Sequence, residues 1–287
     1  MDDLIIGADL GGTKLLFVYG QQTFRVDTGP SFSPEDFAMQ LKSFIAASNL
    51  RSCRIGIAVP GLVSPDGQVV ACDVLPALTG WRPADTLKAL GSHIAVINDV
   101  NAALLEEMHD VPENFTGGIV MAGTAIGSAF IAHGRALQGA SGWAGELGYL
   151  PYPTGGQVKR LDEVAGSAAI AAKLGVDAPT LAKLAGERDT AALTIIREGG
   201  YALGIGLATV INLLNPSLLA VGGGMLKFHD YYDAALSSAE SSAIPELWRD
   251  CRVASVRAGA NVVALGAIRA AAAKPVAQAK RVLSWRF

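Results

Sequence analysis

Two short glycine-threonine segments are the first features of this sequence that could do chemistry. Residues 9–14 read DLGGTK and residues 123–128 read GTAIGS, and each segment follows or ends an apolar run. A glycine-rich bend exposes successive backbone N–H groups, which together form a concavity that binds anions. Two such bends at matching places could close on a polyphosphate from both sides. Each bend taken alone could equally be a tight hairpin with a polar flank.

The first bend carries a carboxylate, Asp9, at the end of its apolar run, and a hydroxyl, Thr13. Magnesium prefers oxygen ligands and keeps several of its waters, so Asp9 could hold Mg²⁺ through water. The bend lies between two expected strands and lacks the GxxxxGKS or GxxxxGKT pattern that opens a helix. These two facts exclude a P-loop.

Asn98 and Asp99 form the third candidate, between an apolar run and an expected helix. Asn and Asp are both favoured as helix N-caps, which would explain one of the two residues. A carboxylate at the carboxyl end of a strand, in a cleft between domains, is also placed to take a proton from a hydroxyl. The residues alone leave both interpretations open.

Two further glycine-rich segments could approach a ligand closely. In residues 139–149, GASGWAGELGY, Glu146 stands among small residues and could accept hydrogen bonds from sugar hydroxyls, or it could be a solvated loop residue. Residues 222–224 are three glycines after an apolar run, where a flat ring such as adenine could lie against the backbone. A plain turn would explain the same three glycines.

The elements that must position these residues follow one order twice. We expect strands at 4–10, 14–19, 23–28, 54–59, 67–72 and 93–98, a helix capped by Ser33 and Asp36, and a helix over about 100–109. A second strand-rich block begins at Gly117, a mainly helical part begins at Asp162, strands return at 218–221 and 252–256, and a helix closes over about 261–273. The polar residues 111–116 are the expected domain boundary.

The composition bounds the class of protein. The chain has 287 residues, of which 51% are hydrophobic and 17% charged, which is typical of a compact protein with room for two domains. A net charge of −3 argues against a nucleic-acid surface. Cys53, Cys72 and Cys251 have neither CxxC spacing nor an even count, which favours a reducing cytoplasm.

No signal peptide or membrane span is expected. Residues 199–226 lack charged side chains and are long enough to cross a bilayer, but they contain seven glycines and the pair Asn215–Pro216. We interpret them as a buried helix, a turn and a buried strand.

Taken together, the segments resemble the ROK family of bacterial sugar kinases and related repressors. Six segments match its motifs in order over nearly the whole chain: DLGGTK (9–14), GIAVPG (56–61), NDVNAA (98–103), GTAIGS (123–128), GASGWAGELGY (139–149) and INLLNPSLLAVGGG (211–224). The resemblance implies an α/β fold of two actin-like ATPase (ribonuclease H-like) domains with a cleft between them. The domains would be 1–116 and 117–287, with the last helix packing back on the first domain, and the protein would be a homodimer.

The resemblance also implies site residues and partners. It makes Asp99 the general base, ATP and Mg²⁺ the cofactors, and a sugar the substrate. The sugar would contact Pro60, Gly61, Asn98, Asp99, Glu146, Tyr149 and Asp162. The nucleotide would contact Asp9, Gly11, Gly12, Thr13, Lys14, Gly123, Thr124, Ala125, Gly222, Gly223 and Gly224, with Mg²⁺ held by Asp9.

The chain departs from the family's pattern at several places. Tyr149 stands where the family has a histidine that binds zinc and sugar, and residues 152–162 contain no cysteine where the family has its zinc loop, so we expect no zinc site. Asp162 aligns with the family's sugar-binding glutamate, with Glu163 next to it as the alternative. Ala125 replaces a glycine, and alanine tolerates a positive φ poorly, so that bend could be strained.

The function expected from these residues is transfer of the γ-phosphoryl group of ATP to a hexose or hexosamine hydroxyl, with O6 as the acceptor. The alternative is a catalytically weakened sugar-binding or sugar-sensing protein or subunit, which Tyr149, Ala125 and the missing zinc loop would suit. The family's repressors carry a helix-turn-helix before the first strand. We expect none here, because the first strand begins at Leu4.

Overall fold

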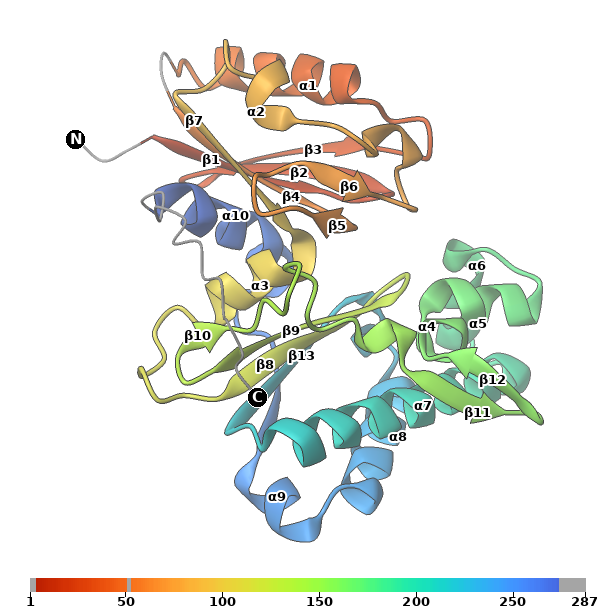
Figure 1. Cartoon of the computed structure of the whole chain (residues 1–287). Helices are drawn as coiled ribbons and strands as arrows, with labels where there is room; N and C mark the ends of the chain where they lie inside the picture. Colours follow the sequence, from red (N-terminus) through yellow and green to blue (C-terminus); the bar gives the residue numbers. More distant parts are fainter. Residues whose placement is uncertain (1–3, 51–52, 274–287) are drawn as a thin grey trace.

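The computed structural model describes residues 4–50 and 53–273, and the chain forms two parts, each built around a five-stranded sheet (Figure 1). Residues 1–3 and 274–287, at the outer ends of the two expected domains, lie outside the described residues.

The first sheet positions the residues of the first half. Its order is β3-β2-β1-β4-β7, with strands β1 (Ile5–Leu10), β2 (Lys14–Tyr19), β3 (Gln22–Asp27), β4 (Arg54–Val59) and β7 (His93–Asn98). The first three are antiparallel, whereas β1, β4 and β7 run parallel. Parallel strands share the direction of their carboxyl ends, so Asp9, Pro60 and Asn98 reach the same edge of the sheet.

One face of this sheet is covered by α1 (Pro34–Ala47), as Figure 1 shows. The helix begins with the expected capping box, since Ser33 Oγ accepts from the Asp36 N–H and the Asp36 carboxylate accepts from the Ser33 N–H. Phe37, Leu41 and Phe44 are buried on one face, as their spacing predicts.

The second sheet repeats this plan. Its order is β10-β9-β8-β13-β14, with strands β8 (Gly117–Ala122), β9 (Ile126–Ala132), β10 (Arg135–Ala136), β13 (Leu218–Gly222) and β14 (Arg252–Ser255). Again three antiparallel strands precede two parallel ones. Because β8 and β13 are parallel, the bend at Gly123 and the glycines 222–224 also share one edge.

Helices cover the second sheet. They are α4 (Asp162–Ala165), α5 (Ser167–Leu174), α6 (Ala178–Gly186), α7 (Thr190–Leu214), α8 (His229–Ser242) and α9 (Pro245–Asp250). The uncharged stretch 199–226 is the buried half of α7, a turn at Asn215 with φ of 45°, and β13, as predicted. Within residues 4–50 and 53–273, no helix combines the length and apolarity needed to cross a membrane.

Two local expectations need correction. The strand expected over 67–72 is shorter: Gly67 has a φ of +80° and belongs to a turn, and β6 (Val69–Ala71) pairs with β5 (Leu62–Val63) outside the main sheet. Residues 151–160 form an unforeseen hairpin of β11 (Pro151–Thr154) and β12 (Gln157–Arg160).

The remaining short helices are α2 (Pro83–Thr86), η1 (Pro76–Leu78), η2 (Leu147–Tyr149), η3 (Gly224–Lys227) and η4 (Gly259–Asn261).

Two helices, α3 (Asp99–Glu107) and α10 (Val262–Ala272), lie between the sheets (Figure 1). Each packs on the sheet of the other half of the sequence. The apolar side chains of α3, including Val100, Ala103 and Leu104, join the core of the second sheet. The last described helix, α10, lies against β1, β4 and β7 of the first sheet.

Glycines allow this close packing. A Cβ on Gly56 would lie 1.8 Å from the carbonyl oxygen of Ala267, and one on Gly266 would lie 1.7 Å from that of Ala102. Both positions therefore bring backbone against backbone, which fixes α10 on β4 and α3 on α10.

We predict that Gly266→Ala destabilises the protein by about 1–3 kcal/mol or more, the cost typical of an overpacked interior. Alanine would otherwise favour a helix interior by about 1 kcal/mol. The matched control is Gly186→Ala in α6, where a Cβ meets nothing within 4 Å. Urea unfolding of both variants checks this, and equal stability of the two would contradict the packing described here.

Candidate active site

The first glycine-threonine bend joins β1 to β2. The Gly11 N–H donates to the Lys14 carbonyl at 2.8 Å, and Thr28 Oγ1 donates to the Gly11 carbonyl at 2.6 Å, so the bend is fixed at both ends. Val74 lies over it, since a Cβ on Gly12 would come within 2.2 Å of Val74 Cγ1. A side chain at position 12 would therefore require Val74 to move.

Asp9 is buried beside this bend, with 8% of its surface exposed. Burial raises the pKa of its carboxyl, and the Lys14 ammonium, whose Nζ lies 3.6 Å from Asp9 Oδ2, opposes the rise. A carboxylate with one neighbouring hydroxyl, Thr13, has the oxygen donors that suit magnesium. No three acidic, His or Cys side chains of the described residues converge on one metal position, so water and phosphate oxygens would have to complete such a site.

The second bend joins β8 to β9. The Gly123 N–H donates to the Ala125 carbonyl at 3.0 Å, and the Gly123 carbonyl accepts from the Ser167 N–H at 2.9 Å. Ala125 is not among the described non-glycine residues with positive φ, so the backbone strain expected at this position is absent. Thr124 and Ala125 are exposed.

The two neighbours Asn98 and Asp99 divide the roles that the sequence left open. Asn98 is the N-cap of α3: its Oδ1 accepts from the N–H groups of Val100 and Asn101 at 3.0 and 3.1 Å. Its Nδ2 donates to the Gly61 carbonyl at 3.0 Å, which ties the helix start to the segment after β4. Asp99 Oδ1 accepts a local bond, from the Val100 N–H at 2.9 Å.

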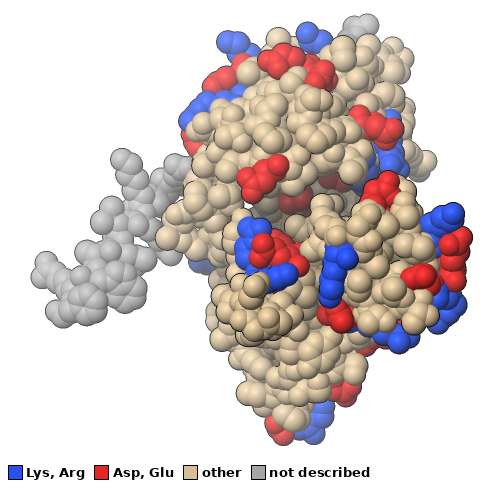
Figure 2. Space-filling model, turned by 90° about the vertical axis from the view of Figure 1, so that its right-hand side faces the viewer, with Lys and Arg blue, Asp and Glu red and all other residues tan. Residues whose placement is uncertain are grey.

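Asp99 is partly buried, and its carboxyl lies close to other acidic groups. Burial, followed by the charge of Asp9 and more weakly that of Glu146, raises the pKa of Asp99 to about 7 against the opposing N–H bond of Val100. Asp9 comes from the first half and Glu146 from the second. Figure 2 shows acidic atoms recessed in a hollow between the upper and lower parts of the molecule.

The loop that carries Glu146 needs its glycines. Gly139, Gly142 and Gly145 have positive φ, and a Cβ on Gly145 would lie 2.4 Å from the Ser128 carbonyl oxygen. Burial, and next the charge of Asp162, raises the pKa of Glu146. Trp143 of the same loop donates its Nε1–H to the Val63 carbonyl at 3.3 Å, which links the two halves. The sequence analysis missed this contact.

Of the two acidic alternatives after the hairpin, Asp162 is the one that contacts the second bend. Its Oδ1 accepts from the Ile126 N–H at 2.6 Å, which ties it to the second bend, and burial raises its pKa. Glu163 instead accepts from the Arg160 N–H at 2.8 Å. Tyr149 is 53% exposed, with the Arg160 guanidinium 4.8 Å from its ring centroid.

The remaining predicted residues border these groups. Gly61 has a φ of +116°, and a Cβ there would lie 2.3 Å from the Ala71 carbonyl oxygen. Gly223 has a φ of +102° and packs against the end of β8. A Cβ on Gly223 would lie 2.2 Å from the Ala122 carbonyl oxygen. Gly223 therefore adjoins the second bend. A Cβ on Gly224 would meet no atom within 4 Å.

Comparison with known proteins identifies the family. The model of the ROK family matches residues 5–274. This chain belongs to the ROK family. The resemblance stated from the motifs is thereby confirmed.

Relatives of this ROK protein are sugar kinases and a regulator. N-acetyl-D-glucosamine kinase of Erwinia tasmaniensis is 27% identical over 276 residues, which cover 84% of this chain and 91% of that one. A glucokinase from Streptomyces griseus, solved with glucose and AMPPNP, has a TM-score of 0.76 at 23% identity and covers 93% of this chain and 98% of its own.

A ROK family transcriptional regulator, a homologue of the MLC protein of E. coli, has a TM-score of 0.77 at 22% identity over 94% of this chain and 78% of its own. Such likenesses establish the fold, and the expected α/β fold with two actin-like parts is confirmed.

The β11–β12 hairpin occupies the segment where the resemblance places the family's zinc loop. Its residues 151–160 contain no Cys or His, the residues that bind structural zinc. The turn is made by Gly155 and Gly156, both with positive φ. The hairpin is held by its backbone pairing and by the packing of Tyr152 on the core of the second sheet, and the lack of a zinc site stays a prediction.

The raised pKa of Asp99 predicts a pH-dependent stability difference. Between its ordinary value of 3.8 and about 7 the folded protein holds a proton that the unfolded chain has lost, so this carboxyl lowers stability as pH rises through that window. We predict that Asp99→Asn unfolds at a higher temperature than the wild type at pH 8, and that the gap shrinks toward pH 4.

Calorimetry at both pH values measures that gap. Asp177→Asn is the control of opposite sign, because the Thr180 side chain and N–H lower the pKa of Asp177 and the variant should gain nothing at pH 8. A pH-independent gap for Asp99→Asn would mean that its carboxyl titrates normally.

Proposed function

We propose that this protein is an ATP-dependent sugar kinase that transfers the γ-phosphoryl group to a hydroxyl of a hexose or N-acetylhexosamine, with O6 as the acceptor. The observation that carries the proposal is the Asp99 carboxyl at the start of α3, where burial, and next the charges of Asp9 from the first half and Glu146 from the second, raise its pKa. Each glycine-threonine bend follows the carboxyl end of the first strand of its sheet, β1 or β8. The kinase relative that matches 84% of the chain supports the same reaction class.

Asp99 acts as the general base in this proposal. As a carboxylate it accepts the proton of the sugar hydroxyl while that oxygen attacks the γ-phosphorus in line, and the bond to the β–γ bridging oxygen breaks to release ADP. A base whose pKa is near the working pH combines availability with a driving force for proton transfer. Its first-turn bond to Val100 holds the carboxyl in place.

Other residues would bind and orient the substrates. Glu146 would accept hydrogen bonds from sugar hydroxyls, and Asn98, whose cap and Gly61 bonds fix it, has one amide hydrogen free for the sugar. Asp162 would contact the sugar through Oδ2 while its Oδ1 holds the second bend. Pro60, Gly61 and Tyr149 would border the sugar.

The nucleotide would lie between the bends. The N–H groups of Gly12, Thr13 and Thr124 and the hydroxyls of Thr13 and Thr124 would face the phosphates, because the Gly11 and Gly123 N–H groups already donate within the bends. Gly11 and Gly123 would border the phosphates, and Gly222, Gly223 and Gly224 would lie beside the adenosine. Bound Mg²⁺, held by Asp9 through water, would supply charge neutralisation of the phosphates. It would also offset the repulsion between Asp9 and Asp99.

The test is ADP release by the purified protein with ATP, Mg²⁺ and a panel of glucose, fructose, mannose and the N-acetylated hexosamines. We predict turnover on at least one sugar, and a loss of about 10²–10⁴-fold in kcat for Asp99→Asn, the usual contribution of a general base. MgATP binding by calorimetry should persist. Activity within several-fold of wild type would remove Asp99 from this role.

The pH dependence gives a separate check. Only ionised Asp99 accepts a proton, so we predict that kcat/KM for the sugar falls below a pH of about 7, the pKa of this carboxyl in the free protein. A profile without an acidic limb near that pH would contradict the assignment.

A sugar-sensing role is the second candidate, since the regulator that shares the fold has a TM-score of 0.77. Measurable sugar binding without turnover on any member of the panel would favour it over the kinase.

A further inference from the structure

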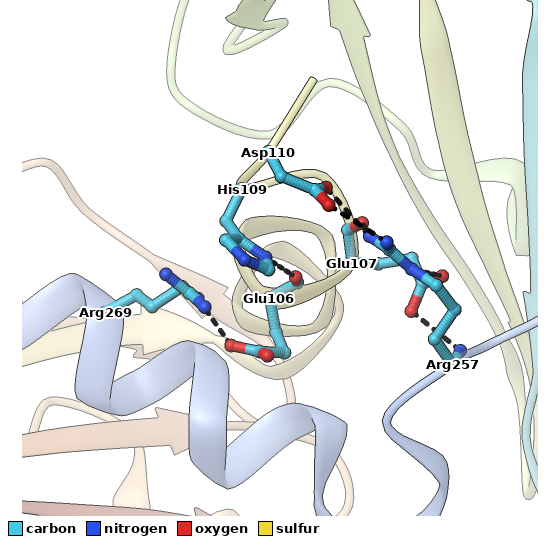
Figure 3. Close-up of polar contacts among 6 residues, drawn as sticks. All are labelled: Glu106, Glu107, His109, Asp110, Arg257 and Arg269. Atoms are coloured by element: carbon cyan, nitrogen blue, oxygen red, sulfur yellow. Dashed lines mark hydrogen bonds and ion pairs between the residues drawn. The ribbon is translucent and has the colours of Figure 1, made fainter.

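The far end of α3 from Asp99 is held by two arginines. Figure 3 shows Arg257 and Arg269 approaching this end from opposite sides, where they meet Glu107 and Glu106. The helix has nine residues, so about 13 Å separate its ends. Its first residue is Asp99.

Arg257 binds the helix end through its backbone N–H and all three guanidinium nitrogens. Its Nε donates to Glu107 Oε1 at 3.1 Å, its backbone N–H donates to Glu107 Oε2 at 2.9 Å, and Nη2 also donates to the Glu107 carbonyl. Nη1 and Nη2 form a fork to Asp110 Oδ2 and Oδ1 at 3.1 and 3.0 Å. Such a planar fork fixes direction as well as distance.

The burial of Glu107 makes this contact demanding. Glu107 is 2% exposed, and a buried carboxylate that loses its cation is left with an uncompensated charge. Asp110 is exposed, and its hydrogen bonds from Arg257 lower its pKa to about 2. The contacts of Arg257 therefore form two arms, a buried arm to Glu107 and a solvent-facing arm to Asp110.

The two arginines tie the helix end to different sheets. Arg257 follows β14 of the second sheet, whereas Arg269 lies on α10, which packs on the first sheet. Arg269 Nε donates to Glu106 Oε2 at 2.5 Å. At the other end, Asn98 is tied to Gly61 of the first half.

We propose that Arg257, through Glu107 and Asp110, is a positioning residue that sets the place of Asp99 relative to the second bend. A short helix moves as a rigid body, so a shift at Glu107 is transmitted to the first turn. A misplacement of about 1 Å at a reacting group can cost 10²-fold in rate. This inference rests on the proposed kinase function for its kinetic consequence, but its structural consequence can be measured without turnover.

The test compares Arg257→Gln with Arg197→Gln in the full chain. Arg197 is a matched control, because its Nε and Nη2 donate to Asp230 Oδ1 at 2.9 and 2.6 Å between α7 and α8, away from α3. Amide hydrogen exchange of residues 100–104 and, on the best sugar, kcat and KM for sugar and MgATP are measured for both variants.

We expect Arg257→Gln to lower kcat by about tenfold or more while KM for MgATP stays within about twofold, a split typical of lost positioning. Exchange should rise through residues 100–104, and Arg197→Gln should change neither quantity. Unchanged kcat, or faster exchange confined to residues 107–110, would overturn the proposal.

Asp110→Asn keeps the test decisive where Arg257→Gln does not fold, because it removes only the solvent-facing arm. It should lower kcat by a few-fold and raise exchange in residues 100–104, and wild-type values for both would overturn the proposal. If the wild type turns over no sugar, the kinase function fails, whereas the exchange data still decide whether Arg257 governs the start of α3.

Discussion

The Asp99 carboxyl is buried at the start of α3, in the field of carboxylates from both halves of the chain, and this burial of charge is the constraint on which the site depends. Burial, and next the charges of Asp9 and Glu146, raise the pKa of Asp99, and burial, and next the charge of Asp162, raise the pKa of Glu146. Like charges in a region of reduced dielectric separate unless something holds them. The arrangement is therefore costly in the free protein, and binding of a cation and of hydroxyl donors would relieve that cost.

What holds the carboxylates together is packing between the two sheets. The helix with Asp99 belongs to the first half of the sequence but packs in the core of the second sheet, and α10 does the reverse. Gly56 and Gly266 let these helices approach with backbone in contact. Because α3 packs on the second sheet and α10 on the first, a movement of either sheet would shift a helix that belongs to the other half of the sequence. Arg257 and Arg269 add directional contacts at the end of α3 where apolar packing gives little orientation.

The sequence predicted the features that depend on near neighbours. The capping box at Ser33, the turn at Asn215 and the strands that precede Asp9 and Asp99 follow from patterns of a few residues. The repeat of strands indicated two similar sheets, and parallel strands then bring their carboxyl ends to one edge. Asn98 and Asp99 were ambiguous, because both residue types cap helices. Only the fold shows that Asn98 supplies the cap while the Asp99 carboxyl stays available.

The contacts that the sequence did not reveal join distant residues. Trp143 and Val63 are 80 positions apart, Arg257 and Glu107 are 150 apart, and no periodicity links them. The hairpin at 151–160 was hidden by two prolines, which normally argue against a strand. The most direct measurement of the whole account is a crystal structure of Asp99→Asn with the accepted sugar, Mg²⁺ and AMPPNP. It should place residue 99 within hydrogen-bonding distance of the acceptor hydroxyl, with both glycine-threonine bends against the phosphates. A sugar hydroxyl turned away from residue 99, or phosphates bound elsewhere, would contradict it.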